Sequence, residues 1–510
     1  MKKTLIMVLA LILALGLAAN ALACTAIYVG ANLTQDGYTY FARSEDMSNS
    51  MNKVAFVAEA GAHKAGEVYS GCYGFTYTFT HDSYSYTAFS DDNLSGYCPD
   101  CGGEHAHTPY QAAGTNEMGV SMSATESLYS LDEIDAVDPY LDEGIEEAEI
   151  VTVILSEAAT AKEGVDLLLS IYDSVGACGG SGIFIADKNE TWYIENCSGT
   201  QYVALKLNAG LAFVQPNVSV IGLIDLSDEN VIASSKLIET AVNAGTFIGD
   251  ADKNQIDFTG SYTAYALSTS ERMVNGLNYV NGVDSYTSEN ITPADFTLTN
   301  VSEDGSLTAL TCAVTPYKAF SNEDFFAYYQ VNAIGKTGNL ETHIFATTPA
   351  MDYAVEWISM NDGQYTVFVP YFPQYTTEMW SGYYVGTDEA SFSETQPEEG
   401  FSYPATKRVW TSEGPATKEG YVTLPEGWEN GYYWTFDALS NYIEYVDAAQ
   451  KDYVVSELAA LQQEFLAVYE ANLQSIIDGT ATKEAITASQ IEMAQKAQEK
   501  AYALFLEISK

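Results

Sequence analysis

Positive charge is scarce in this sequence. Lysine and arginine together number 21, against 69 aspartate and glutamate residues, which gives a formal net charge of -48 at pH 7. A surface of this sign repels nucleic acid and anionic membranes. We therefore expect no nucleic-acid partner, and we attribute the charge to solubility and not to the fold.

Long apolar runs are also absent beyond the first residues. The chain opens with two lysines after Met1, continues with an apolar run at 5–17 that is too short to span a bilayer well, and reaches the small-x-small sequence ALA at 21–23. This pattern predicts a signal peptide over residues 1–23. We expect the mature protein to begin at Cys24, to have no membrane span, and to lie outside the cytoplasm, either secreted or in the cell envelope.

Histidine is the third scarce residue. The five histidines lie in no recognisable Cys–His protease signature, so the sequence disfavours a protease of that kind. Seven cysteines in an exported chain leave at least one thiol over, and Cys24 is the natural candidate. Once Cys24 is the first residue, its α-amino group has a pKa of about 8 and can accept the thiol proton. The sequence thus indicates a terminal cysteine nucleophile that needs no histidine.

A cysteine directly after a leader has a second interpretation. Bacterial lipoproteins are lipidated at such a residue, which would make this chain a ligand-binding surface protein. That pathway usually prefers leucine three residues before the cysteine, where this chain has Ala21. Lipoproteins also tend to continue with a flexible tether, whereas CTAIYVG at 24–30 predicts a strand. From this segment alone both interpretations stay open.

Several motifs, in order along the chain, resemble those of the C69 dipeptidase family, within the wider group of choloylglycine-hydrolase-like and penicillin-V-acylase-like enzymes. The opening CTAIYVG is followed by DGYTYFARSED, which together match the start of that family. Further matches are NEMGVSMSATES at 116–127, the segment 147–168, the segment 185–207 and, more weakly, QPNVSVIGLIDL at 215–226 and TSERM at 269–273. The resemblance spans most of residues 24–380.

The resemblance implies the roles of five catalytic residues. Cys24 attacks the amide carbonyl, and its own amine takes up and returns the proton. Asp46 orients the Cys24 amine or thiol, and Arg43 holds the thiolate. Asn217 is implied as the side-chain donor of the oxyanion hole, and Arg272 closes the polar network around the nucleophile.

Arginine content supports two of these roles independently. The chain has only three arginines, Arg43, Arg272 and Arg408, and two of them fall in the motifs above. The forked guanidinium is suited to carboxylates and to holding a nearby thiolate. We expect Arg43 and Arg272 to be functional, with a structural ion pair as the alternative for each.

The strand at 119–126 is expected to form another wall of the site. Strand alternation allows only one of Thr125 and Glu126 to face the substrate near the oxyanion. For Trp192 and Glu195 in TWYIEN, we favour a buried central strand over substrate binding.

A short Cys- and His-bearing segment, CPDCGGEHAH at 98–107, is compatible with a metal. Cys98, Cys101, His105 and His107 could bind a structural zinc ion tetrahedrally. Oxidised cysteine pairing and a plain loop are the alternatives in an exported protein. The implied chemistry requires no cofactor in any of these cases.

The fold that the resemblance implies is α+β, a four-layer αββα sandwich of the N-terminal-nucleophile hydrolase type with a C-terminal helical extension. We predict a hydrolase domain over 24–435 and helices over 436–510, split near 478–480. We also predict one helix across about 145–172 and mostly irregular structure over 376–435. The implied substrate is a dipeptide, with a non-peptide amide as the alternative, and the sequence leaves a homo-oligomer open.

Overall fold

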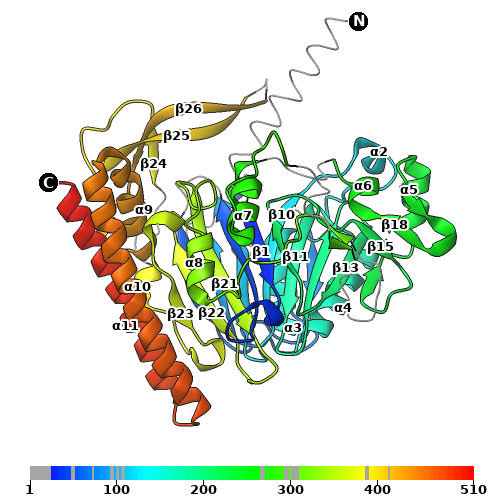
Figure 1. Ribbon diagram of the computed structural model, residues 1–510, viewed down its shortest axis with the longest axis horizontal. Coiled ribbons are helices and arrows are strands. Elements are labelled where there is room, and N and C mark those ends of the chain that lie inside the picture. Colours follow the sequence, from blue (N-terminus) through cyan, green and yellow to red (C-terminus); the bar gives the residue numbers. More distant parts are fainter. Residues whose placement is uncertain are drawn as a thin grey trace, which may run out of the picture.

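The chain is described by a computed structural model in which two β-sheets stand face to face between layers of helices (Figure 1). The structure describes residues 24–46, 52–71, 74–91, 97–98, 103–104, 110–264, 270–291, 298–299, 309–384, 390–411 and 414–510. Within these ranges, no helix combines the length and the apolar character needed to cross a membrane.

The first sheet is antiparallel and contains the predicted hairpin at Cys24. Its strand order is β14 (Ala212–Gln215), β1 (Thr25–Val29), β2 (Thr39–Asp46), β21 (Asn339–Thr347), β22 (Val355–Met360) and β23 (Val369–Tyr371). Strand β1 therefore lies inside the sheet, between β14 and β2. The hairpin turns at Gly37, whose φ of 74° suits glycine, and the Asp36 carboxylate accepts a hydrogen bond from the Tyr38 backbone N–H at 3.0 Å.

The second sheet supplies the opposite wall. It is also antiparallel, in the order β16 (Val231–Ala233), β13 (Tyr202–Leu207), β12 (Thr191–Asn196), β11 (Gly180–Ala186), β10 (Ser121–Leu128), β9 (Gln111–Asn116), β6 (Tyr86–Asp91) and β3 (Lys53–Ala58). Aromatic side chains join the two inner faces. The ring centroids of Phe41 and Phe184 lie 5.4 Å apart, and those of Tyr193 and Phe213 lie 5.3 Å apart.

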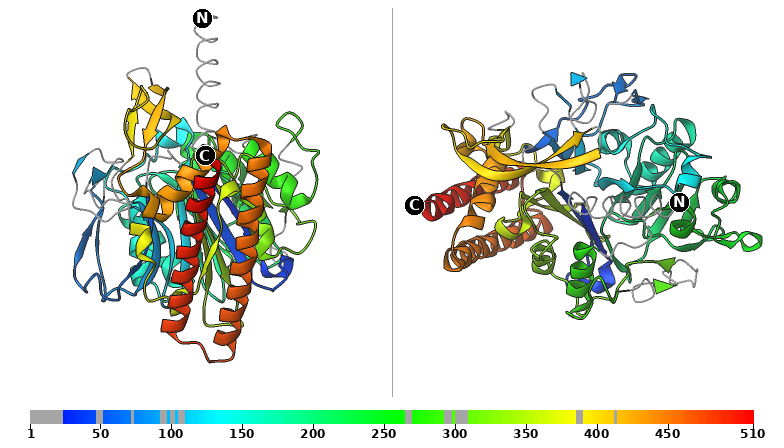
Figure 2. Two further views of the ribbon diagram at one scale, coloured as in Figure 1. Left: turned by 90° about the vertical axis from the view of Figure 1, so that its left-hand side faces the viewer. Right: turned by 90° about the horizontal axis from the view of Figure 1, so that it is seen from above.

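Helices cover the outer face of each sheet. α3 (Glu147–Glu157) and α4 (Ala161–Ser174) pack on the second sheet, while α9 (Tyr432–Tyr442), α10 (Ala448–Ile477) and α11 (Lys483–Ile508) pack on the first (Figures 1 and 2). Trp192 points outward into the apolar layer beneath α3 and α4, as a buried core residue. The predicted α+β class and four-layer αββα arrangement are confirmed.

The predicted helix over 145–172 is two helices. α3 ends at Glu157, and the hydroxyl of Thr160 accepts a hydrogen bond from the Glu163 backbone N–H at 3.1 Å, which caps the start of α4. A threonine that caps a new helix ends the preceding one, because the N-cap residue has extended backbone angles.

The prediction of mostly irregular structure over 376–435 is wrong. β24 (Ser391–Ser393), β25 (Ser402–Thr411) and β26 (Gly414–Thr423) form a small sheet, and the β25–β26 hairpin projects from the body of the molecule (Figure 1). The glycine and glutamate content of this region obscures the threonine and tyrosine residues that favour strands.

The two long C-terminal helices are separated where the sequence indicated. α10 ends at Ile477, Gly479 has a φ of 67°, and α11 begins at Lys483. The apolar core extends from the first sheet into these helices without interruption. The domain boundaries at 23/24 and 435/436 stay predictions.

Candidate active site

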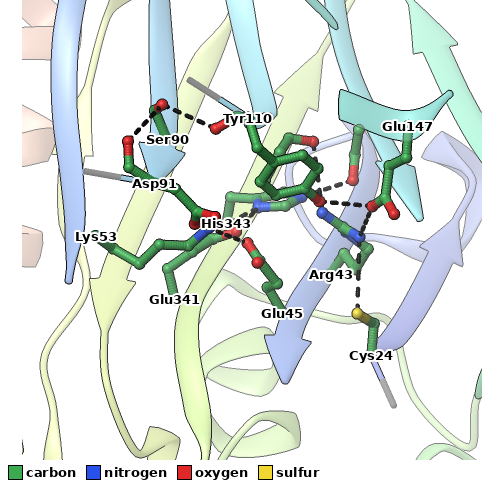
Figure 3. A network of polar contacts seen from close by, with 12 residues as sticks. Cys24, Arg43, Glu45, Lys53, Ser90, Asp91, Tyr110, Glu147, Glu341 and His343 are labelled. Atoms are coloured by element: carbon green, nitrogen blue, oxygen red, sulfur yellow. Dashed lines mark hydrogen bonds and ion pairs between the residues drawn. The ribbon is translucent and has the colours of Figure 1, made fainter. Parts of the chain in front are cut away.

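Cys24 stands at the start of the central strand β1 and is half-buried. Arg43 lies on the neighbouring strand β2, where it pairs in register with Ala26. The Arg43 Nη1 donates to the Cys24 Sγ at 3.7 Å (Figure 3). The hairpin thus brings a guanidinium to the thiol through local strand pairing alone.

Arg43 is held in place by groups from the other sheet and its helix. Its Nη1 forms an ion pair with the Glu147 Oε1 at 3.1 Å, and its Nη2 donates to the Ala112 carbonyl at 3.4 Å. The Tyr110 hydroxyl donates to the same Glu147 oxygen at 2.6 Å. Glu147 lies in the first turn of α3, where the helix dipole favours a carboxylate. The guanidinium therefore bridges the thiol and a nearly buried carboxylate.

Arg272 contacts Cys24 from a helix that lies far along the chain. It lies in the first turn of α7 (Glu271–Asn281) and is only 3% exposed. Its Nη1 donates to the Cys24 carbonyl and to the Thr25 hydroxyl, and its Nη2 donates to the Pro216 carbonyl at 3.4 Å. One side chain thus ties the nucleophile to the segment that carries Asn217.

Asp46 is the last residue of strand β2 and is buried, with polar partners other than Cys24. One carboxylate oxygen accepts from the Asn339 amide at 2.6 Å, and the other lies 3.1 Å from the Lys336 ammonium. Its charge nevertheless acts on the Cys24 thiol, whose pKa it raises. The predicted contact with the Cys24 amine stays a prediction.

Asn217 and Thr125 come together although they belong to different sheets. Asn217 follows β14 in the first sheet, and Thr125 lies on β10 in the second; the Thr125 hydroxyl donates to the Asn217 Oδ1 at 3.5 Å. In this arrangement the Oδ1 of the Asn217 amide accepts from Thr125, and the Nδ2 is the donor of the side chain. Asn217 also has a φ of 57°, a left-handed conformation that is uncommon outside glycine. The side chain of Glu126 lies outside the described residues.

The surroundings raise the pKa of the Cys24 thiol. Burial is the largest cause; the Arg43 charge opposes it, while Asp46, Glu147 and Glu45 add to it. A thiol of raised pKa is protonated at neutral pH, so attack on a carbonyl requires a group that accepts its proton.

A second buried charge network lies beyond Arg43 (Figure 3). The fully buried Lys53 ammonium forms ion pairs with Glu45 and Asp91, each at 2.6 Å. Nearby, the His343 ring contacts Glu341 at 2.9 Å. Burial raises the pKa of Glu45 to about 8, opposed by the Lys53 charge. The sequence does not indicate this network. Glu45 lies in the motif DGYTYFARSED, but none of its partners Lys53, Asp91, Glu341 and His343 stands in a motif.

Glu147 and Tyr110 were also missed. Two features point to Glu147. It lies in the acidic first turn of a helix that is otherwise apolar, and a buried arginine needs a carboxylate partner.

The predicted zinc ligands lie outside the part of the chain whose side chains are described. Cys98 ends the short strand β7 (Tyr97–Cys98), described for its backbone only, and Cys101, His105 and His107 are not described. Among the described residues, no group of three or more His, Cys, Asp or Glu side chains could hold a metal ion. The structural zinc stays a prediction.

Comparison with known proteins places this site in a family. Residues 23–273 match the model of Peptidase family C69. The chain is 38% identical over 249 residues to a protein of Streptococcus pyogenes named probable dipeptidase B, which covers 48% of each chain. It is 33% identical over 250 residues to a probable dipeptidase of Salmonella dublin, covering 48% of this chain and 54% of that one. The chain thus aligns with about half the length of these curated relatives.

A solved structure of a conjugated bile acid hydrolase from Clostridium perfringens is similar to 68% of this chain and 92% of its own, at 12% identity and a TM-score of 0.33. All five catalytic residues implied by the resemblance lie within the matched region 23–273. Through that region, the chain belongs to peptidase family C69.

Proposed function

We propose that this protein is a cysteine dipeptidase that hydrolyses dipeptides through a thioester acyl-enzyme on Cys24. The observation that carries the proposal is the position of the Cys24 residue between two buried arginines, in a chain that has only three. Arg43 contacts the thiol, and Arg272 holds the carbonyl of the same residue. The dipeptide as substrate rests on the names of the relatives.

In the proposed acylation step, the Cys24 sulfur forms a bond to the carbonyl carbon of the dipeptide. The thiol proton passes to the α-amino group of Cys24, and the carbonyl oxygen becomes an oxyanion that accepts a hydrogen bond from the Asn217 Nδ2. The α-ammonium then returns the proton to the leaving nitrogen as the C–N bond breaks. The products are a thioester and a free amino acid.

In the proposed deacylation step, water attacks the thioester carbon. The α-amino group takes the proton of the water, and the C–S bond breaks as the sulfur regains a proton. The second amino acid leaves, and the enzyme returns to its starting state. The two arginines stabilise negative charge and geometry; neither exchanges a proton.

This chemistry requires that Cys24 be the first residue of the active protein. A free amine is a base near neutral pH, whereas a peptide nitrogen is not. We therefore propose that residues 1–23 are removed, and that the mature enzyme acts outside the cytoplasm.

The test uses the protein that begins at Cys24 and its Cys24→Ala variant, assayed on a panel of dipeptides. The matched control is Cys197→Ala, because Cys197 is a fully buried cysteine that directly follows β12 in the second sheet, whereas Cys24 directly precedes β1 in the first. We expect Cys24→Ala to abolish cleavage with an unchanged circular dichroism spectrum, and Cys197→Ala to remain active. Dipeptide turnover by Cys24→Ala near the unsubstituted rate would refute the proposal.

Two further measurements separate the alternatives. Cleavage of a glycine-conjugated bile salt, with no cleavage of any dipeptide, would support a non-peptide amide hydrolase. A diacylglycerol on Cys24 in the intact mass of the exported protein would support the lipoprotein and contradict the enzyme.

A further inference from the structure

Glu195 is a fully buried carboxylate on the inner face of β12, between the two sheets. Four neutral groups donate hydrogen bonds to it. The Tyr193 hydroxyl and the Val220 backbone N–H donate to Oε1 at 2.8 and 2.7 Å, and the Ser219 hydroxyl and the Ile221 backbone N–H donate to Oε2 at 2.5 and 3.4 Å. The carboxylate is thus solvated by the protein itself.

A carboxylate in this position is costly to maintain. Burial raises the pKa of Glu195 to about 7, although all four donors pull it down. A buried ionisable group is weak evidence for stability, since apolar residues of similar volume are often at least as stable. Buried groups with perturbed pKa values gather instead at functional sites.

Three of the four donors lie in one short segment. The connection between β14 and β15 (Leu223–Asp225) contains Asn217 and, two to four residues after it, Ser219, Val220 and Ile221. The Ser219 hydroxyl also contacts the Thr259 hydroxyl at 2.7 Å, and this second contact helps to hold the Ser219 side chain in place. The Glu195 carboxylate therefore fixes the backbone immediately after Asn217.

The other side of Asn217 is fixed as well. Arg272 donates to the Pro216 carbonyl, and the Gln215 side-chain amide donates to the Val218 carbonyl at 3.2 Å. Between these anchors Asn217 has its left-handed backbone, with a φ of 57°. Such a conformation persists only where the surroundings over-determine it.

We propose that Glu195 is a positioning residue for the oxyanion donor: by holding residues 219–221 it places the Asn217 side-chain amide where the oxyanion forms. This inference rests on the proposed function, in which Asn217 is that donor. Glu195 does not touch the reacting atoms and acts through Asn217.

A carboxylate is required for this role, and not merely a polar side chain. It accepts at both oxygens, whereas the amide of glutamine would turn an NH₂ group toward a backbone or hydroxyl donor. Aspartate keeps both acceptors and loses one methylene. We therefore expect Glu195→Gln to be more harmful than Glu195→Asp.

The experiment measures kcat and KM for dipeptide hydrolysis by the enzyme that begins at Cys24. Misplacement of a catalytic group by about 1 Å costs on the order of a hundredfold in rate. We expect Glu195→Gln to lower kcat by about 10- to 100-fold with little change in KM, because the oxyanion contact is made in the transition state. Glu195→Asp should recover part of the loss.

The matched control is Glu356→Gln. Glu356 is another fully buried carboxylate between the sheets, accepts from the Thr87 hydroxyl at 2.7 Å, and has a pKa that burial raises to about 8. It lies on β22, away from the Asn217 segment, so Glu356→Gln should leave kcat unchanged.

A double-mutant cycle decides whether Glu195 acts through Asn217. In an Asn217→Ala background the donor is absent, so adding Glu195→Gln should lower kcat no further. A full additional loss in that background, or no loss from Glu195→Gln alone, would overturn the inference. If Cys24→Ala abolishes cleavage while Glu195→Gln is harmless, the inference about Glu195 fails and the proposed function stands. Cleavage by Cys24→Ala would show that the proposed function itself is wrong.

Discussion

Replacing Arg43 with glutamine should raise the pKa of the Cys24 thiol, because a positive charge next to the thiolate is lost. Arg43 Nη1 lies 3.7 Å from the sulfur, where Coulomb's law gives about 4 kcal/mol at an effective dielectric constant of about 20 and about 1 kcal/mol in water. The Glu147 carboxylate on the same nitrogen, at 3.1 Å, offsets part of this. One pKa unit corresponds to about 1.4 kcal/mol, so the loss of an interaction of this size should raise the pKa of the Cys24 thiol measurably.

The assay is the pH dependence of alkylation by iodoacetamide, followed for the Cys24 peptide by mass spectrometry. Arg43→Gln leaves a nearly buried carboxylate without its cation, so the variant should also be less stable. Glu147→Gln is the complementary variant. The charge of Glu147 raises the pKa of the Cys24 thiol, so the loss of this charge should lower that pKa. The double variant loses both charges and should titrate close to the unsubstituted protein. An unchanged or lower thiol pKa in Arg43→Gln would refute the electrostatic role.

Three other predictions concern the oxyanion donor, stability and metal. Asn217→Ala and Asn217→Gly should both lower kcat on the order of a hundredfold or more. The glycine variant should have the higher melting temperature of the two, because the φ of 57° suits glycine. A kcat equal to that of the unsubstituted enzyme in either variant would contradict the role of Asn217. The pKa of Glu356 is raised from 4.5 to about 8 in the folded protein, so the free energy of unfolding should fall as pH rises from about 4.5 to 8. Urea unfolding of Glu356→Gln should show a smaller fall over the same pH range. The same pH dependence in the variant and the unsubstituted protein would contradict this prediction. A zinc chelator should leave dipeptide hydrolysis unchanged even if it lowers the melting temperature, because the proposed steps use only Cys24, its amine and Asn217; loss of activity that zinc restores would contradict the proposed chemistry.

The sequence predicts the part of the site that is local. The hairpin from Cys24 to Asp46 follows from alternating residues around Asp36-Gly37, and strand pairing alone brings Arg43 to the thiol. Contacts between distant segments do not follow from local patterns. Glu147 lies 104 residues from Arg43, and Arg272 lies 248 residues from Cys24. The family resemblance and the scarcity of arginine indicate Arg272, but neither pairs Glu147 with Arg43.

The same limit explains what was missed elsewhere. The strand TWYIEN was predicted correctly, and Trp192 is a core residue as favoured, yet the donors that surround Glu195 come mainly from a segment 24 to 26 residues later. Their convergence depends on how the two sheets pack, which the pattern of a single strand does not contain. The β25–β26 hairpin does not follow from the sequence, because the glycine and glutamate content of the region obscures the residues that favour strands.

One measurement tests the central claim most directly: the activity of two purified chains, one beginning at Cys24 and one beginning at Ala23. Both contain the same thiol, arginines and Asn217, and differ in whether the Cys24 nitrogen is an amine or an amide. We predict dipeptide hydrolysis by the first chain and none by the second until Ala23 is removed. Equal turnover by the chain that begins at Ala23, with its terminus verified by intact mass after the assay, would contradict the account.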